Sequence, residues 1–474
     1  KSAAVTLSTG NLTFSGSSSD GGYIKGSIGL TTGKWYWEMT MSDSVACSSG
    51  IQGIYNDLDS LYASGQNAVV YNEDGTKNIN TGGGMTSSSY GATYSSGDVI
   101  GVALNLDDNE VTFYKNNASQ GAITGLGADI TWTIASQRHG SGTHGFVFES
   151  GSTTFAYTPP TGFNAVNTTN LFSASAPAIE DGSAHFQTTL YTGDNSSGRA
   201  IVQTGNSQFQ PDLVWLKART QARFHHLVDV VRGAGNTLQT NQNNAQGSNA
   251  PVTDFNSNGF DVTKNSDWDY NDSGTSELGW QWKAGGSASA NNTGNVTVQL
   301  SANQTAGFSI GTFNSGVQGS GITLGHGLGA VPKMIWMKTS SAVTPWWVYF
   351  EDVGNTKYLQ FGASGNSTPA TNAKVWRNTT PTSTIFTTSG EEGGSGWLAD
   401  NQDNVFYAFA EIPGFSKFGA FTSGSSGNPF IECGFTPALI FLKRTSANDD
   451  WYVQDTTRDP NNPAYRYLIW NTTA

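Results

Sequence analysis

A seven-residue motif occurs three times after residue 210, and its repetition constrains the fold more than any other feature of the sequence. Each copy begins with proline, continues through apolar residues and one aromatic residue, and ends with lysine. The copies are Pro211–Lys217 (PDLVWLK), Pro332–Lys338 (PKMIWMK) and Pro437–Lys443 (PALIFLK). Three copies of one order of residue types predict one supersecondary unit repeated along the chain.

The surroundings of the motif repeat as well. A leucine follows each lysine at a similar distance, since 238−217 and 359−338 both give 21 and 468−443 gives 25; these leucines are Leu238, Leu359 and Leu468. The first two copies continue to an aromatic segment, Trp280–Trp282 in one and Tyr407–Phe409 in the other. One unit therefore spans roughly 110 residues. We expect Trp215 to match Trp336, Leu238 to match Leu359, and Trp282 to match Phe409.

The motif itself predicts a strand. Proline cannot donate a hydrogen bond to a neighbouring strand, so it suits the first position. The apolar run that follows is typical of a central strand buried on both faces, and we expect the lysine to mark where the strand emerges into water. A second slot holds His225-His226, Trp346-Trp347 and Trp451-Tyr452 in the three copies. Because this slot takes large planar side chains, the two histidines are interpreted as packing surfaces.

The whole chain has the pattern of an all-β protein. Short runs rich in Val, Ile, Thr, Tyr, Phe and Trp alternate with turn-forming Gly, Asn, Asp and Ser. Within Asp98–Lys115, two alternating runs flank Asp107-Asp108-Asn109, which predicts a hairpin. Oxygen-rich turns such as this one and Asn56–Asp59 could hold calcium, but Asp and Asn also favour turns without any ion, and we prefer that interpretation.

The N-terminal block, from about Leu7 to Tyr157, resembles a SPRY domain. The resemblance rests on Gly33–Glu38 (GKWYWE), on the Gly101–Leu104 segment and on Val111–Asn116 (VTFYKN), in that order. It covers about a third of the chain. It implies an antiparallel β-sandwich that recognises proteins or ligands through the loops between its strands and has no catalytic apparatus.

These patterns give a domain plan. We expect a SPRY-like β-sandwich at 1–165, followed by tandem β-sandwich-like repeats at 166–300, 301–415 and, in part, 416–474. The Asn/Ser/Thr/Gly-rich segment Gly285–Gln304 is expected to loop over the surface. Only six residues follow Leu468, so either the native polypeptide continues past Ala474 or a neighbouring subunit supplies the missing strands. The first residue, Lys1, is not methionine, which favours an excerpt of a longer protein.

Composition excludes several classes of function. With 23 Lys+Arg against 36 Asp+Glu and a net charge of −13, the chain repels both a nucleic-acid backbone and an anionic membrane. No apolar stretch of about 18 residues is present, so we expect no membrane insertion. Fourteen Trp, 17 Tyr and 25 Phe supply ample mass for packed cores, which argues against wholesale disorder.

The sequence shows no pattern typical of an enzyme or a metal protein. Cys47 and Cys433 stand 386 positions apart, and the six histidines lack metal-ligand spacing, so neither a cofactor nor a metal is expected. No nucleophile elbow or separated carboxylate pair is recognisable. The candidate ligand-binding residues are three loop aromatics near acidic residues, Trp268, Tyr270 and Trp397. Such rings could stack on sugars, or they could be packing anchors inherited with the repeat.

The combination of a SPRY-like block with these repeats resembles structural proteins of tailed bacteriophages, found among tail fibres and other components of the virion surface. The resemblance implies an extracellular adhesin that binds a host surface glycan or protein, contacts other virion proteins and forms a homo-oligomer, with a trimer favoured. Two alternatives remain open. One is an architectural protein that decorates a capsid or tail without binding the host. The other is a secreted protein that binds or degrades polysaccharide.

Overall fold

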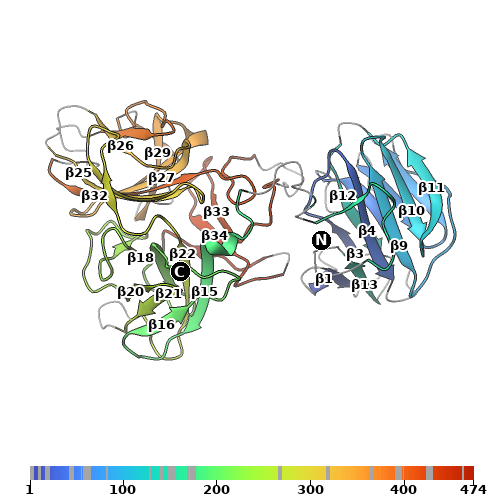
Figure 1. Cartoon of the computed structure of the whole chain (residues 1–474), viewed down its shortest axis with the longest axis horizontal. Helices are drawn as coiled ribbons and strands as arrows, with labels where there is room; N and C mark the ends of the chain where they lie inside the picture. The colour runs from blue at the N-terminus through green and yellow to red at the C-terminus, as the bar shows by residue number, and fades with distance from the viewer. Residues whose placement is uncertain are drawn as a thin grey trace. The chain divides into compact units, whose positions relative to one another are not determined.

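The computed structural model describes residues 5–8, 12–16, 22–41, 47–54, 56, 66–81, 84–127, 130–138, 142–147, 155–167, 170, 178–264, 270–316, 321–362, 365, 367–372, 374–389, 398, 400–422, 431–461 and 464–473. Two compact units make up the chain (Figure 1). The first contains Lys1–Ala176, Phe421–Phe435 and Pro460–Ala464; the second contains Pro177–Ala420, Thr436–Asp459 and Tyr465–Ala474.

The first unit is a sandwich of two β-sheets. One sheet has the order β1(Val5–Ser8), β2(Thr13–Gly16), β13(Gly142–Val147), β4(Lys34–Met41), β9(Val99–Asn105), β10(Glu110–Lys115), β11(Ala118–Thr124), and β14(Asn164–Ala165) pairs with β4. The other has the order β3(Gly22–Lys25), β12(Trp132–Arg138), β5(Cys47–Gly53), β6(Asn67–Asn72), β7(Thr76–Thr81), β8(Thr86–Ser89). Trp37 and Val102 of the first sheet share one buried cluster with Ile51 and Val69 of the second. Apolar side chains from both sheets therefore fill one core.

The hairpin predicted within Asp98–Lys115 is present. Strands β9 and β10 pair from Asn105 and Glu110 outward. Asp107 Oδ1 accepts the Gly33 N–H at 2.8 Å, and Asp108 Oδ2 accepts from Asn105 Nδ2 at 2.7 Å. These carboxylates bond to donors around the turn, in agreement with its interpretation as a turn. In the other acidic loop, Asp57–Asp59 lie outside the described residues.

The second unit contains three related sheets, which we call repeats 1, 2 and 3 (residues 177–284, 285–420 and 436–473 without 460–464). Repeat 1 has the order β15(Phe186–Thr192), β22(Ser276–Trp282), β17(Leu213–Ala218), β18(His226–Asp229), β19(Leu238–Gln239). Repeat 2 has β23(Ser289–Asn291), β24(Val298–Asn303), β25(Phe308–Asn314), β32(Asp403–Ala410), β27(Pro332–Thr339), β28(Trp346–Phe350), β29(Lys357–Phe361), β30(Ala370–Thr371). Repeat 3 has β33(Leu439–Lys443), β34(Trp451–Asp455), β35(Leu468–Ile469).

Two smaller sheets cover the outer faces of repeats 1 and 2. The sheet of repeat 1 is β16(Arg199–Val202), β21(Gly259–Val262), β20(Val252–Asn256), and that of repeat 2 is β26(Ile322–Gly325), β31(Ile385–Thr388). Short 3-10 helices occur at η1(Gly182–Ala184) and η2(Glu351–Val353). In the described part of the chain, no helix is long and apolar enough to cross a membrane.

Strand pairing confirms the predicted register of the repeats. In repeat 1, Trp215 pairs with Trp280 on one side and Leu227 on the other, and Leu227 pairs with Leu238. The corresponding pairs in repeat 2 are Trp336 with Tyr407, Trp336 with Val348, and Val348 with Leu359. Repeat 3 pairs Phe441 with Val453 and Val453 with Leu468. The expected match of Trp282 with Phe409 also holds, because they pair with Leu213 and Met334, which are equivalent.

Two expectations about the repeats were wrong. The segment Gly285–Gln304 is no surface loop, because it contains β23 and β24, which extend the sheet of repeat 2. The motif lysines do not emerge into water either, since Lys217 is 1% and Lys338 0% exposed. Lys217 Nζ donates to the Thr473 carbonyl of repeat 3 at 2.8 Å, so a carbonyl from another repeat takes the place of water.

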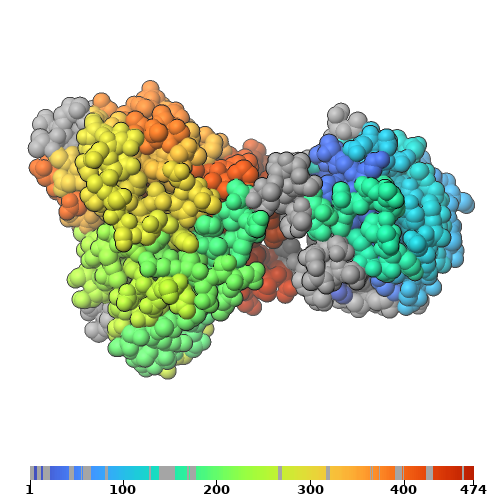
Figure 2. All heavy atoms as spheres, in the orientation of Figure 1, coloured from blue at the N-terminus to red at the C-terminus, as the bar shows by residue number. Residues whose placement is uncertain are grey.

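The three repeats surround one aromatic core with approximate threefold symmetry. The motif aromatics Trp215, Trp336 and Phe441 form a nearly equilateral triangle, with ring centroids 6.2, 6.1 and 6.2 Å apart. All three belong to or pack against a single cluster with members from every repeat. In Figure 2 the atoms of repeats 1 and 2, green and yellow to orange, meet without a gap. The repeats therefore share a core instead of each burying its own.

A cyclic set of hydrogen bonds joins the repeats. Trp346 of repeat 2 donates its Nε1–H to the Gln239 carbonyl of repeat 1 at 2.9 Å, and Trp451 of repeat 3 donates to the Gln360 carbonyl of repeat 2 at 3.0 Å. His225 of repeat 1 closes the ring, with Nε2 3.1 Å from the Ile469 carbonyl of repeat 3. The histidine thus occupies the tryptophan slot, as predicted, and replaces an indole N–H with an imidazole N–H.

Candidate binding pocket

A pocket of about 360 Å³ lies between repeats 1 and 3. Its lining combines the end of β17 and the start of β22 with the segment that leads into β35. The lining residues are Arg219, Thr220, Ser276, Arg458, Tyr465, Arg466, Tyr467 and Leu468. Three of these eight residues are arginines and none is acidic, in a chain whose net charge is −13. The pocket is therefore a local concentration of positive charge on an acidic protein.

Backbone hydrogen bonds hold the two sides of the pocket in place. The Arg219 N–H donates to the Ser276 carbonyl at 2.7 Å and continues the ladder between β17 and β22. On the opposite side, Asp459 Oδ2 accepts the N–H groups of Tyr465 at 2.7 Å and Arg466 at 3.1 Å. These two bonds lower the pKa of Asp459. The carboxylate that fixes this segment is thus directed at the backbone.

Arg458 is part of the framework of the pocket. Its Nε donates to Asp455 Oδ2 at 2.5 Å, and both side chains are almost fully buried, with 3% and 0% exposed. Its Nη2 donates to the Val453 carbonyl at 3.1 Å, and its guanidinium lies 5.9 Å from the centre of the Trp280 ring. Because these partners fix Arg458, its contribution to binding is positional and electrostatic.

Arg219 and Arg466 supply the charge that a ligand can reach. Within the described residues, no hydrogen bond or ion pair engages the Arg219 guanidinium, and Arg466 has one bond, from Nη1 to the Arg458 carbonyl at 3.3 Å. Burial lowers the pKa of Arg219; the positive charges of Arg458 and Arg466 lower it further, whereas Asp455 opposes them. Mutual repulsion of the guanidiniums favours the arrival of an anion.

Two tyrosines form an exposed aromatic rim. Tyr465 is 73% and Tyr467 54% exposed, and the Tyr467 ring packs edge-on against Tyr452 at 5.3 Å. An exposed phenol ring offers an apolar face together with a hydroxyl that donates and accepts. Arginine beside such rings is a combination that can hold an acidic group and pack against the ring that carries it.

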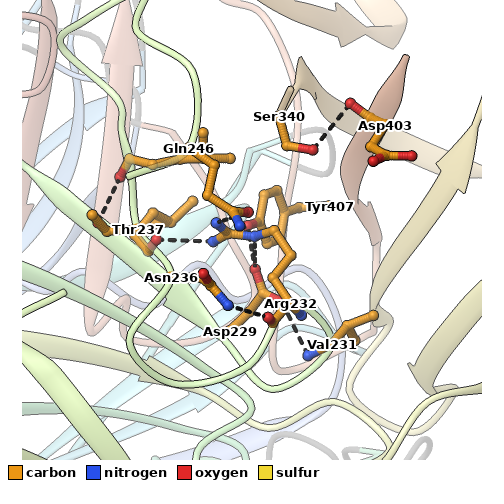
Figure 3. Close-up of polar contacts among 11 residues, drawn as sticks. Asp229, Val231, Arg232, Asn236, Thr237, Gln246, Ser340, Asp403 and Tyr407 are labelled. Atoms are coloured by element: carbon orange, nitrogen blue, oxygen red, sulfur yellow. Dashed lines mark hydrogen bonds and ion pairs between the residues drawn. The ribbon is translucent and has the colours of Figure 1, made fainter. Parts of the chain in front are cut away.

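The equivalent place between repeats 1 and 2 has a different chemistry (Figure 3). By strand register, Ser340 corresponds to Arg219, Asp403 to Ser276, and Asn236 to Arg466. Gln246 bridges this junction, because its N–H donates to the Ser340 carbonyl at 2.7 Å and its Oε1 accepts from Arg232 Nη1 at 3.2 Å. The arginine-rich lining is therefore not a general property of the repeat. It is specific to the junction of repeats 1 and 3.

The predicted ligand-binding residues do not form this pocket. Trp268 and Trp397 lie outside the described residues. Tyr270 was assigned wrongly, because its ring is 0% exposed and packs edge-on against His226 at 5.0 Å. Its hydroxyl donates to the backbone carbonyl of Phe224. Tyr270 is therefore one of the packing anchors that the alternative interpretation proposed.

The pocket left a faint signal in the sequence. Aligning the repeats on the motif places Arg219 and Arg466 where repeat 2 has Ser340 and Lys357, and places Tyr465 where repeat 1 has Gly235. The gathering of these residues also depends on contact between repeats 1 and 3, whose lining residues stand more than 180 positions apart. Spacing within a single repeat contains no information about that contact.

Comparisons with known proteins identify two regions. The model of a family described as "Domain of unknown function (DUF7483)" matches residues 181–474, and the SPRY domain model matches residues 34–126. The SPRY match includes the strands on which the resemblance rested, so the SPRY assignment of the N-terminal third is confirmed. A search of the curated proteins finds no sequence match.

Similar solved structures include three SPRY domains. A human SPRY domain is 22% identical, covering 30% of this chain and 94% of that chain, with a TM-score of 0.26. The SPRY domain of human HERC1 is 15% identical, covering 30% and 91%, with a TM-score of 0.26. The TRIM65 PSpry domain is 16% identical, covering 31% and 86%, with a TM-score of 0.25.

Proposed function

The chain belongs to the DUF7483 family, with a SPRY domain ahead of the family region, and from this premise we propose that it is a recognition protein of a virion surface. Its ligand is an acidic saccharide of the host surface, held at the junction of repeats 1 and 3. The observation that carries the proposal is the pocket with three arginines and no acid in its lining, beside two exposed tyrosines.

The chemistry of the pocket selects this class of ligand. A guanidinium binds a carboxylate or sulfate with paired, directional hydrogen bonds, which neutral sugars cannot reproduce. The rings of Tyr465 and Tyr467 offer apolar faces for the C–H surface of a sugar ring. A pocket of about 360 Å³ is of the size of one or two saccharide units and is open to a longer chain.

The virion setting rests on the resemblance of a SPRY block followed by these repeats to structural proteins of tailed phages. Recognition by a particle gains strength from many weak sites presented together, since linked sites raise the effective concentration of the second contact. A homotrimer would supply such copies. Light scattering of the purified chain measures the number of copies directly.

A glycan array tests the function. The full chain should bind carboxylated or sulfated saccharides and leave their neutral counterparts unbound, with an affinity that falls as salt is added. Arg219→Ala and Arg466→Ala should each weaken binding about tenfold or more, because each removes a hydrogen bond to a charged group. Arg444→Ala is the matched control, since Arg444 is an exposed arginine of repeat 3 outside the pocket.

Whole-cell binding completes the test. Host cells should bind the chain, and removal of their acidic surface glycans should abolish this binding. Equal binding of acidic and neutral saccharides, or an equal loss in Arg444→Ala, would contradict the ligand class. Binding to virions but not to cells would favour an architectural protein, and release of reducing ends from host polysaccharide would favour an enzyme.

A further inference from the structure

The motif strand of repeat 3 has an open edge. In repeat 1 the motif strand β17 lies between β22 and β18, and in repeat 2 β27 lies between β32 and β28. In repeat 3, β33 pairs only with β34 among the described residues and is the edge of a three-stranded sheet. Two repeats therefore show what covers this edge: one antiparallel strand.

The open edge presents backbone groups to a partner. The Thr456 N–H donates to the Ala438 carbonyl at 3.1 Å, as Val230 donates to Asp212 at 3.0 Å in repeat 1, so Ala438 faces β34. Because antiparallel strands alternate the direction of their backbone groups, Leu439 and Phe441 face the open side. Their N–H and C=O groups have no partner in the described part of the chain. Such an edge is a template for strand addition.

Apolar side chains beside this edge are also uncovered. Ile440 is 39% exposed, whereas its equivalents Val214 and Ile335 are both 0% exposed. The whole of β17 is buried, while no residue of β33 is. The exposure is therefore confined to the one motif strand that lacks a second neighbour.

The threefold arrangement specifies the residue that should lie opposite Phe441. Tyr407, opposite Trp336, donates its hydroxyl to Asp229 of repeat 1 at 2.6 Å. Trp280, opposite Trp215, donates its Nε1–H to Asp455 of repeat 3 at 3.3 Å. In both cases the aromatic residue beside the motif bonds to an aspartate of the next repeat around the ring.

The third place in this cycle has no acid. The position of Asp229 and Asp455 is Phe350 in repeat 2, and the position of Arg232 and Arg458 is Val353. Phe350 and Val353 are half-buried and pack against the shared core. A tyrosine or tryptophan arriving opposite Phe441 would thus meet an apolar wall and leave its polar hydrogen unpaired.

We propose that β33 accepts an antiparallel strand of a partner protein, with apolar side chains at alternate positions and with Phe or Leu opposite Phe441. The added strand completes the shared aromatic core and continues the established interface between the repeats. A second copy of the chain is disfavoured as the donor. Its strands of this pattern, β22 and β32, are already paired on both sides, so donation would disrupt its own sheets.

Peptide binding to the full chain tests the proposal. The probe is a fluorescent peptide with the β32 sequence Asp403–Ala410 and the substitution Tyr407→Phe; the comparison peptide keeps Tyr407. The phenylalanine peptide should bind about tenfold more tightly, because it buries no unpaired hydroxyl. A peptide that also contains Phe409→Asp should not bind, since this residue points into the core in repeat 2.

The variant Phe350→Asp provides the decisive comparison. It restores the acid of repeats 1 and 3 at a half-buried position, so the chain should now prefer the tyrosine peptide. Hydrogen exchange should show slower exchange at Leu439 and Phe441 only when peptide is bound. Failure of both peptides to bind, or the same preference in both forms of the chain, would overturn the proposal. A dimer with protected β33 amides in the absence of peptide would assign the edge to a second copy.

Discussion

His225 shows how a single residue can replace another by function instead of shape. Its Nδ1 accepts the Trp215 Nε1–H at 3.1 Å, which leaves Nε2 to carry the proton that it donates to the Ile469 carbonyl. One tautomer therefore satisfies both bonds, and the side chain must remain neutral. Burial lowers the pKa of His225 well below its usual value and that of its neighbour His226 to about 3.

This burial predicts acid sensitivity. Between pH 3 and about 6.5 an unfolded chain binds protons that the folded chain cannot accept at His226, so stability should rise with pH across this window and be lost as pH falls. His226→Tyr, which copies Tyr452 of repeat 3, should reduce the slope by up to about 1.4 kcal/mol per pH unit. Urea denaturation of both proteins between pH 4.5 and 7.5 measures the difference.

Comparing the two proteins removes the effect of other groups. Burial raises the pKa of Glu277 to about 7, so this residue contributes the opposite trend between pH 4.5 and 7, and it does so in both proteins. A slope unchanged by His226→Tyr would show that the imidazole is not held neutral.

At the scale of elements, the turn after the second strand of each repeat determines how neighbouring repeats join. In repeat 1, Arg232 Nε donates to Asp229 Oδ2 at 2.6 Å, and Tyr407 of repeat 2 donates to the same oxygen (Figure 3). Repeat 3 has the same pair in Asp455 and Arg458, whereas repeat 2 has Phe350 and Val353. One turn thus exists in an ionic and an apolar form.

Removing one partner of the ionic form should be costly. Asp229→Ala leaves the buried Arg232 and the Tyr407 hydroxyl without their acceptor and should lower the free energy of unfolding by about 3 to 5 kcal/mol. The triple variant Asp229→Phe, Arg232→Val, Tyr407→Phe converts the turn to the form of repeat 2 and should recover most of this loss. Urea denaturation compares the proteins. A triple variant as unstable as Asp229→Ala would show that the two forms are not interchangeable.

The sequence predicted these elements better than their surroundings. The motif spacing gave the strand register of all three repeats, because pairing within a repeat depends on local alternation. It misplaced Lys217 and Lys338, since a lysine at the end of a strand ordinarily reaches water, and only the neighbouring repeat reveals carbonyls there. The pocket of Arg219 and Arg466 escaped for the same reason. Contacts around the ring are not encoded in any one repeat.

On the scale of the whole molecule, the shared core predicts that the three repeats unfold together. Trp470 of repeat 3 is fully buried and packs against Trp336 at 4.8 Å and Phe361 at 4.7 Å, both in repeat 2. Trp470→Ala should cost about 3 to 5 kcal/mol and should accelerate hydrogen exchange in all three repeats. Trp37→Ala in the SPRY sandwich is the matched control, expected to affect only the first unit. Faster exchange in repeat 3 alone would contradict a common core.

The approximate threefold axis also affects valency. A ring of three separate, identical subunits would present the same pocket three times, and every mutation would change all of them at once. Here the three positions belong to one polypeptide, so each has diverged independently: arginines and tyrosines at one junction, Ser340 and Asp403 at another. Each chain therefore carries one arginine-rich pocket. The number of ligands that an assembly can grip equals the number of chains brought together, not three times that number.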